Sequence, residues 1–271
     1  RGIEHHTKGV ENVLSYINLV LATGRIGKPG SGYGTLTGQG NGQGGREHGQ
    51  RCNQLPGGRD INNPEHREHI ADFWGIDETK LPREGLTACE IIDDIEMGKI
   101  KALISISFNP LVSIPDSART RKALEKLEHF TAIDFFLSET AQYADVVLAG
   151  SLQEEDEGTV TTGEGRCVRL RPVVRPAAGA RVDWHIIADL ARRLGAGEYF
   201  THETAADIFK ELTAASAGGP IDYSGMSYER IENEMGIFWP CPAPNHPGTP
   251  RLFVGGRFAH PDGRAKFHAF P

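Results

Sequence analysis

The sequence has few cysteines, and none of them forms a metal-binding pair. Only four of the 271 residues are cysteine, and no two of them are spaced as C-x-x-C. Zinc and iron–sulfur sites in proteins are usually built from closely spaced cysteines, so the sequence offers no candidate metal site of this kind. We expect all four to be buried free thiols, because an unpaired cysteine behaves as a small apolar residue. They are Cys52, Cys89, Cys167 and Cys241.

Long apolar runs and an excess of positive charge are also missing. No run approaches the roughly 18 apolar residues that a membrane-spanning helix needs. The first residue is Arg1, and we expect no signal peptide before it. The net charge of −7 provides no basic surface for nucleic acid. We therefore expect neither a membrane span nor a nucleic-acid partner. A chain that begins with arginine is expected to be a piece of a longer protein.

The stretch from residue 100 to 150 has the pattern of a strand–helix–strand unit. An Ile-rich run over residues 102–107 has the length of a buried strand, and residues 117–127 have the apolar spacing of a helix. A second strand is predicted over residues 130–133 and a third over residues 146–148. Strands joined in this way are parallel, with a right-handed crossover. The fold class is therefore α/β with a parallel sheet.

Two polar side chains follow neighbouring strands of this predicted sheet. Asn109 comes just after the first strand and Asp134 just after the second. Ligands of parallel sheets bind beyond the carboxyl ends of the strands. An acid at this place can hold a ribose diol, or accept two hydrogen bonds from the edge of guanine, since an ionised carboxylate only accepts. It can equally be a helix cap or a surface acid, and the residues alone leave these alternatives open.

The segment from residue 24 to 49 is dense in glycine, and its other residues are mainly polar. Glycine loses much backbone entropy on ordering, so a packed helix or a central strand is not expected here. Gln39, Asn41 and Gln43 are interleaved with the glycines, whereas flexible linkers are mostly Gly and Ser. This mixture favours a loop that brings backbone close to a polar ligand over a plain linker. The segment is not a phosphate loop, because the closing Gly-Lys-Ser/Thr is missing.

Periodicity predicts further helices and one hairpin. The acidic run at residues 154–157 is interpreted as a solvated charge run rather than as a set of metal ligands, with the arginines that follow it as possible partners. Asp183 is placed as the N-cap of a helix. The predicted helices cover residues 8–22, 63–74, 88–98, 184–194, 201–212 and 227–234, and the predicted hairpin covers residues 253–258.

Short motifs, taken in their order along the chain, resemble the molybdopterin oxidoreductases of the dimethyl sulfoxide reductase superfamily. The resemblance is strongest to the catalytic subunits of nitrate reductases and formate dehydrogenases. Each motif alone is weak, but their common order makes the resemblance specific. They are H-T-K-G-V-E-N from His6, L-A-T-G-R-I-G-K-P-G from Leu21, L-T-G-Q from Leu36, G-R-E-H-G from Gly45, N-P at Asn109, A-D-V-V-L from Ala144, E-G-T from Glu157, W-P-C from Trp239 and P-D-G-R-A-K-F from Pro261.

The resemblance implies a bis-(molybdopterin guanine dinucleotide) molybdenum cofactor. It also implies a Rossmann-like, three-layer domain with helices on both faces of the parallel sheet. Asp134 would pair with guanine, and Asn109 would lie beside the same nucleotide. The other residues that the resemblance places at the cofactor are Gly38, Gln39, Asn41, Ser107, Phe108, Phe135, Ser138 and Thr140.

The resemblance also predicts a division of the chain. Residues 1–235 would form the dinucleotide-binding domain, with residues 24–60 as the loop at the cofactor and substrate funnel. Residues 236–271 would be an arm toward a further domain. The family's [4Fe–4S] cysteines and its cysteine or selenocysteine ligand to molybdenum would precede Arg1. No catalytic residue or metal ligand is therefore assigned here, and the isolated chain is expected to be inactive.

Nitrate is the substrate that the resemblance favours. Formate dehydrogenases of this family commonly have arginine at the position of Thr37, whereas Leu-Thr-Gly-Gln is the nitrate reductase pattern. The expected reaction is reduction of nitrate to nitrite in the cytoplasm, with electrons from a partner protein or subunit. Formate oxidation is the alternative. A third possibility, from another class, is a non-catalytic nucleotide-binding or interaction domain that keeps only the scaffold.

Overall fold

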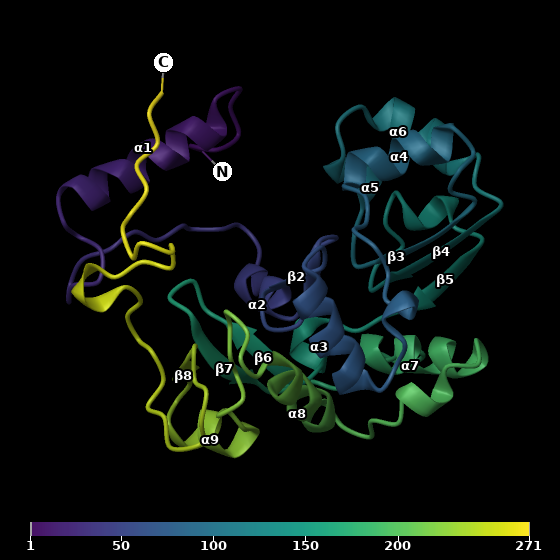
Figure 1. The fold of residues 1–271 in the computed structure, drawn as a ribbon. Helices are drawn as coiled ribbons and strands as arrows, with labels where there is room; N and C mark the ends of the chain where they lie inside the picture. The colour runs from purple at the N-terminus through teal and green to yellow at the C-terminus, as the bar shows by residue number, and fades with distance from the viewer. Residues whose placement is uncertain (1, 271) are drawn as a thin grey trace.

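A three-stranded parallel sheet occupies one end of the molecule (Figure 1). The computed structural model describes residues 2–270. In the sheet, β4 (His129–Asp134) lies between β3 (Ala102–Ile106) and β5 (Val146–Ala149). The register places Ile106 opposite Ile133 and Asp134 opposite Ala149, so all three strands end at one edge. The strands predicted from sequence are confirmed.

Helices cover both faces of this sheet. Figure 1 shows α4 (Ala88–Glu96) and α6 (Ser117–Leu124) above the strands and α7 (Asp183–Arg193) below them. On the first side, Ile92, Ile95 and Ala123 form a buried cluster against the sheet residue Leu103. The short helix α5 (Pro110–Ser113) follows β3 and adds Leu111 to a neighbouring cluster around Phe130. The expected three-layer α/β arrangement is therefore present.

A second, antiparallel sheet was not predicted. It consists of β6 (Gly158–Thr161), β7 (Arg166–Leu170) and β8 (Ile237–Phe238), in that order. The helices α8 (Ala205–Ser216) and α9 (Tyr228–Asn233) lie beside it (Figure 1). Their shared core contains Cys167, Phe209, Tyr223, Met226, Ile231, Ile237 and Cys241.

The segment after residue 235 contributes to this core. Ile237 pairs with Cys167 of β7, and both side chains are buried together with Cys241. The beginning of the predicted arm is thus packed against the second sheet. The division of the chain at residue 235 stays a prediction.

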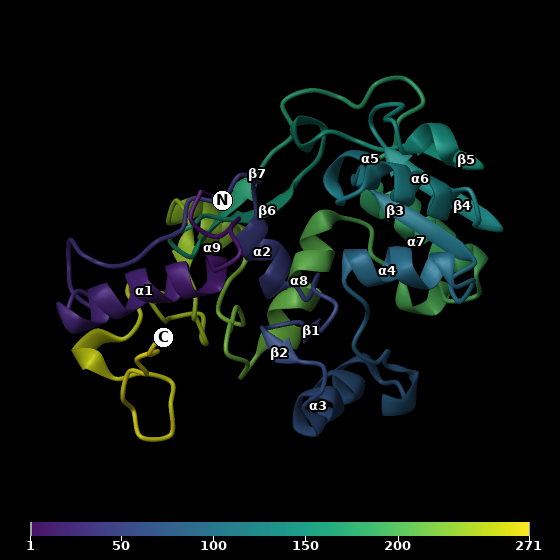
Figure 2. The same cartoon turned by 90° about the horizontal axis from the view of Figure 1, so that it is seen from above.

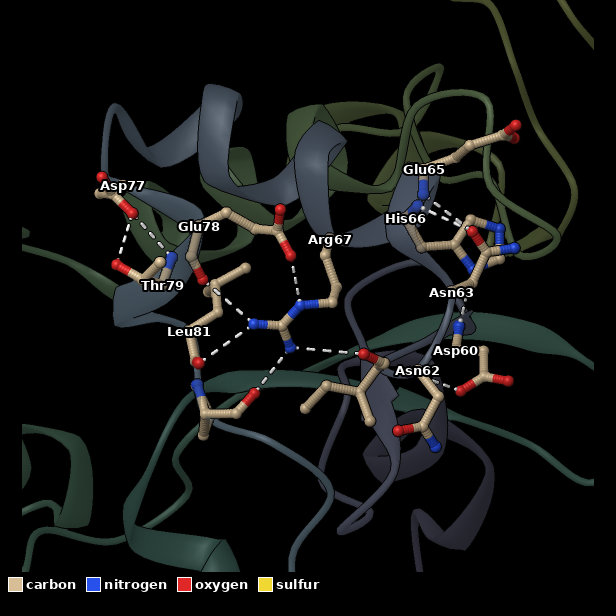
Figure 3. Close-up of polar contacts among 12 residues, drawn as sticks. Asp60, Asn62, Asn63, Glu65, His66, Arg67, Asp77, Glu78, Thr79 and Leu81 are labelled. Atoms are coloured by element: carbon tan, nitrogen blue, oxygen red, sulfur yellow. Dashed lines mark hydrogen bonds and ion pairs between the residues drawn. The ribbon is translucent and has the colours of Figure 1, made fainter.

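A buried arginine organises the region around α3 (Pro64–Trp74). Figure 3 shows the guanidinium of Arg67 between this helix and the turn η1 (Glu78–Lys80). Arg67 is 3% exposed and donates to Glu78 Oε1 at 2.7 Å and to the carbonyl oxygen of Leu81 at 3.1 Å. It also reaches the carbonyl oxygens of Ile61 (3.4 Å), Pro82 (2.8 Å) and Glu78 (3.0 Å). Because a guanidinium has five N–H donors, this one side chain donates hydrogen bonds to several loop carbonyls at once.

The hairpin of β1 (Gln54–Leu55) and β2 (Arg59–Asp60) lies next to this region. Leu55 packs with Ile70 of α3 and with Ala215, which is near the end of α8. Arg59 donates to the carbonyl oxygen of Ala215 at 2.8 Å. The region around α3 is thereby attached to the helix beside the second sheet.

The first helix lies with the end of the chain, away from the parallel sheet (Figures 1 and 2). The side chain of Asn18 in α1 (Gly9–Ala22) exchanges two hydrogen bonds with the backbone of His268, at 2.7 and 3.1 Å. Part of its apolar side is uncovered, since Val10 is 75% exposed. Among residues 2–270, no helix is long and apolar enough to cross a membrane.

Two local predictions are wrong. Residues 253–258 form no hairpin but the single turn η5 (Val254–Gly256), because Phe253, Gly255 and Gly256 have positive φ angles that a strand cannot continue through. Cys52 and Cys89 are exposed rather than buried, while Cys167 and Cys241 are buried as expected. Cys89 lies in the first turn of α4, whose buried residues are Ile92 and Ile95.

The remaining predicted helices are confirmed with small shifts at their ends. The helix predicted from residue 201 begins at Ala205, where Thr204 caps it, and extends to Ser216. Three single turns complete the structure, namely η2 (Ala141–Tyr143), η3 (Gln153–Glu155) and η4 (Gly197–Tyr199).

Candidate nucleotide and cofactor site

The chain turns back over the end of β4 directly after β3. Ser107 has a φ of 47°, and its backbone N–H donates to the carbonyl oxygen of Ile133 at 2.8 Å. The hydroxyl of Ser105 donates to the carbonyl oxygen of Phe108 at 2.8 Å, which fixes this turn. Residues 107–109 are therefore held at the carboxyl edge of the sheet, beside the residues that follow β4.

Asn109 joins the loops that follow β3 and β4. Its Nδ2 donates to Glu139 Oε2 at 2.7 Å, and its Oδ1 accepts from the hydroxyl of Thr140 at 2.6 Å. The buried Thr140 hydroxyl in turn accepts from the N–H of Leu111 at 3.1 Å. The pKa of Glu139 is lowered by its own backbone N–H and by Asn109. Two of the predicted site residues, Asn109 and Thr140, thus bond to each other, and this contact holds the two loops together at the sheet edge.

Asp134 lies at the same edge and shapes the loop that follows it. Its Oδ1 accepts from the N–H of Phe135 at 2.8 Å, and its Oδ2 accepts from the hydroxyl of Ser138 at 2.9 Å. Oδ1 also accepts a long hydrogen bond from the N–H of Phe136 at 3.5 Å, whereas Oδ2 has a second acceptor position free. The side chains of Phe136 and Leu137 are 70% and 68% exposed beside it. An acid with free acceptor capacity next to exposed apolar side chains suits a planar base with N–H donors.

Asp183 joins these residues, although the sequence predicts it only as a helix cap. The N-cap of α7 is Val182, and Asp183 is the first helical residue, so the capping prediction is wrong by one position. Its Oδ1 accepts from the N–H of Ser151 at 3.1 Å, and its Oδ2 from the Ser107 hydroxyl at 3.5 Å. A Cβ on Gly150 would lie 2.4 Å from Oδ1, so only glycine fits there.

Burial raises the pKa of Asp183, and the charge of Asp134 raises it further. The hydrogen bonds from Ser151 and Ser107 act in the opposite direction. A second acid therefore faces the edge where Asp134 lies. No signal in the sequence separates Asp183 from the many acids that begin helices, because its position depends on how α7 packs beside β3 and β5.

The glycine-rich segment lines a separate cavity of about 200 Å³. Gln39 and Asn41 are on its wall, whereas Gly38 is not. Asn41 has a φ of 56°, and its Oδ1 accepts from the N–H of Thr161 at 2.9 Å. The full lining is Thr35, Thr37, Gln39, Gly40, Asn41, Gly42, Gln43, Thr161, Thr162 and Gly163.

This segment contains a helix, contrary to the prediction. Residues Gly42–Glu47 form α2, with Gly44, Gly45 and Glu47 buried. Contacts across the fold outweigh the unfavourable glycine content, because the Glu47 carboxyl bonds to Thr161 of β6 at 2.7 Å. The glycines are needed for close packing, since a Cβ on Gly44 would lie 2.1 Å from Asn41 Oδ1.

The predicted residues therefore fall into two groups. One group is at the sheet edge, around Asn109 and Asp134, and the other is at the cavity, around Gln39 and Asn41. The segment that follows β5 reaches both groups. Its Ser151 bonds to Asp183 at the sheet edge, and its Gln153 side chain lies close to Gly40 of the cavity.

The acidic run after β5 is partly paired, as the charge pattern suggested. Arg169 of β7 forms an ion pair with Glu157 at 3.1 Å. Glu155 accepts from the N–H of Leu152 at 2.9 Å. Within residues 2–270, no group of three or more His, Cys, Asp or Glu side chains is arranged to hold a metal ion.

Comparison with known proteins identifies the family. The family model for molybdopterin oxidoreductases matches residues 1–193. The chain belongs to the molybdopterin oxidoreductases. Membership implies a molybdenum–pterin cofactor, and both groups of site residues lie within the matched residues.

Three relatives of this family show the range of similarity. The chain is 55% identical over its whole length to the assimilatory nitrate reductase catalytic subunit of Bacillus subtilis. It is 38% identical, over 98% of its length, to the F420-dependent formate dehydrogenase 2 subunit alpha of Methanococcus maripaludis. It is 32% identical, over 97% of its length, to the periplasmic nitrate reductase of Desulfovibrio desulfuricans. The chain spans 38% of the length of each of these relatives.

Proposed function

We propose that this molybdopterin oxidoreductase chain is the central cofactor-binding portion of a nitrate reductase, which reduces nitrate to nitrite. The chemistry that the bound molybdenum group supplies is oxygen-atom transfer. The sequence identity of 55% to an assimilatory nitrate reductase catalytic subunit favours nitrate over other substrates. The chain's own contribution is to bind and orient the cofactor.

The arrangement at the sheet edge is the observation that carries this proposal. Asp134, Asn109 and Asp183 lie at one carboxyl edge, linked through Ser138, Thr140 and Ser107. This is the edge of a parallel sheet at which nucleotides bind. Asp134 would accept the N–H donors of guanine, and Asp183, as the second acid, would accept from hydroxyl groups of the same nucleotide.

The proposal also covers the form of the cofactor, the source of electrons and the location of the protein in the cell. We infer a bis-(molybdopterin guanine dinucleotide), with Gln39 and Asn41 near the pterin end and Phe108 and Phe135 near the nucleotide. A [4Fe–4S] cluster elsewhere in the whole protein and an electron-transfer partner would deliver electrons, and the protein would work in the cytoplasm. The isolated chain would be inactive.

Substitution of Asp134 in the full-length protein tests the nucleotide site. Asp134→Asn keeps the size of the side chain but replaces one acceptor oxygen by an N–H donor. We expect less molybdenum per protein, and less guanosine monophosphate released by acid, because two charge-assisted hydrogen bonds of about 1.5–3 kcal/mol each are weakened.

The control is Asp72→Asn, which changes an exposed acid on α3 without touching the sheet edge. Its cofactor content should equal that of the wild type. Unchanged molybdenum and guanosine monophosphate in Asp134→Asn would contradict the proposed role. Absence of both groups from the wild-type protein would instead favour a nucleotide-binding or interaction domain without redox function.

Formate oxidation is the second candidate, because a formate dehydrogenase subunit is 38% identical. Thr37 lines the cavity, where its hydroxyl donates to the carbonyl oxygen of Gln39 at 3.3 Å. Assays of the full-length protein with nitrate and a reduced viologen, and with formate and an oxidised viologen, separate the two. Turnover of formate alone would replace the nitrate assignment.

A further inference from the structure

A carboxyl group is buried at the end of α2. Glu47 is 3% exposed, and α2 has only six residues, three of them glycine. Such a helix has little stability of its own, so its position depends on contacts with the rest of the fold. The backbone carbonyl of Glu47 accepts from the N–H of Gly57 at 3.0 Å, and its side chain points to the second sheet.

One oxygen of this carboxyl group forms a closed ring with two hydroxyl oxygens. The Thr161 hydroxyl lies 2.7 Å from Glu47 Oε2, and the Tyr223 hydroxyl bonds to the same oxygen. The two hydroxyl oxygens are themselves 2.8 Å apart. Three such contacts need three hydrogens, whereas the two hydroxyls supply only two. A protonated Glu47 supplies the third, and the ring is then complete.

The side chains that bond to the Glu47 carboxyl are uncharged hydroxyls, and the adjacent cation Arg46 has only a minor effect on its pKa. Arg46, the adjacent cation, bonds to Gln43, and burial lowers the pKa of His48 to about 4, which keeps its ring neutral. Cys167 of β7 is also neutral, since burial raises its pKa to about 12. Burial raises the pKa of Glu47 as well, more than its hydrogen bonds and Arg46 lower it.

We propose that Glu47 is a positioning residue, which as a neutral acid closes a ring with Thr161 and Tyr223 and so fixes the glycine-rich wall of the cavity to β6. Gln39 and Asn41 belong to this glycine-rich wall, and Thr161 and Thr162 line the same cavity. All three residues of the ring are buried, since Glu47, Thr161 and Tyr223 are 3%, 4% and 1% exposed. The effect of the ring on cofactor binding rests on the proposed function.

Infrared spectroscopy of the full-length protein tests the proton directly. The wild type should show the carbonyl band of a protonated carboxyl group at neutral pH, and Glu47→Gln should lack that band. Glu90→Gln is the matched control, because Glu90 is an exposed capping residue whose pKa is lowered by Thr87. A wild-type spectrum without the band, or a band that persists in Glu47→Gln, would overturn the neutral acid.

The pH dependence of unfolding gives a second measure. An acid whose pKa is higher in the folded state stabilises the fold at low pH, and this contribution is lost as pH rises from its ordinary value of 4.5 through the folded pKa. Glu47→Gln has no such group, so we expect its stability relative to the wild type to increase between pH 5 and 8. A constant difference would overturn the inference.

The molybdenum content of two Glu47 variants tests whether the neutral ring positions the wall of the cavity. Glu47→Gln keeps a neutral group of the same shape and should retain most of the wild-type molybdenum, whereas Glu47→Ala should lose most of it. Equal losses in both variants would overturn the role of the neutral ring. Full molybdenum in Glu47→Ala, with the infrared band present in the wild type, would keep the proton but overturn the positioning role. Loss of molybdenum from Asp134→Asn in the same series would show that the proposed function still holds.

Discussion

Replacing Arg67 should destabilise the protein strongly. Arg67→Met keeps most of the apolar stem but removes a guanidinium that donates to one carboxylate and four backbone carbonyls (Figure 3). Four of these five contacts are 3.1 Å or shorter. The carbonyl oxygens of Ile61 and Leu81 belong to buried residues and would lose their charged donor.

The magnitude follows from the balance of these contacts. Hydrogen bonds to a charged group contribute about 1.5–3 kcal/mol each, but they are not additive, and burying the guanidinium has a cost that its removal recovers. Glu78 is 48% exposed and regains water at little cost. We expect a loss of about 3 kcal/mol in the free energy of unfolding, which lowers Tm by about 6–12 °C for a cooperative unit of about 150–250 residues.

Thermal and urea unfolding of the full-length protein measure this effect. Arg83→Met is the matched control, because Arg83 follows the same turn and is exposed. Its Tm should stay within about 2 °C of the wild type, as expected for a surface substitution. A loss below about 1 kcal/mol in Arg67→Met would refute the idea that this one side chain holds α3 to the turn η1.

Three further predictions concern the site and the core. Gly44→Ala should lower the free energy of unfolding by about 1–3 kcal/mol, because the added Cβ would lie 2.1 Å from Asn41 Oδ1. Gly42→Ala in the same helix is the control, because its Cβ would meet no atom within 4 Å. Thermal unfolding should show that this second variant is tolerated. Alkylation of the native protein, read by mass spectrometry, should modify the exposed Cys52 and Cys89 quickly. The buried Cys167, whose pKa is about 12, should react only after unfolding. Fast labelling of Cys167 would contradict its burial. His48 has a pKa of about 4 in the folded protein, so the unfolded state binds the proton first as pH falls. The free energy of unfolding should therefore decrease by up to about 1.4 kcal/mol per pH unit between pH 6.5 and 4. Urea unfolding of His48→Phe should lack this pH dependence.

The parallel sheet could be predicted because its strands carry a strong local signal. Residues 102–107 form a continuous apolar run, and the helix after Asp116 has a clear capping residue. Strand direction then follows from the connection, and the carboxyl edge follows from the direction. Asn109 and Asp134 could therefore be placed at one edge before any coordinates were known, and they are found there.

The second sheet could not be predicted, because its strands are short and depend on distant partners. β6 reads Gly-Thr-Val-Thr, and β8 has only two residues and pairs with a strand about 70 positions earlier. The helix α2 was missed for a similar reason, since glycine disfavours it locally and Glu47 stabilises it from across the fold. Asp183 reaches the site only through the packing of α7.

The pairing of β8 with β7 matters for anyone who prepares shorter versions of this protein. A version that stops at residue 235 would lack Ile237 and Cys241, which close the cluster around Tyr223. Tyr223 would then be open to solvent on one side, and the hydroxyl that it directs at Glu47 would be free to move. Expression trials should therefore extend at least to Thr249, which bonds back to the carbonyl oxygen of Phe238 at 3.0 Å.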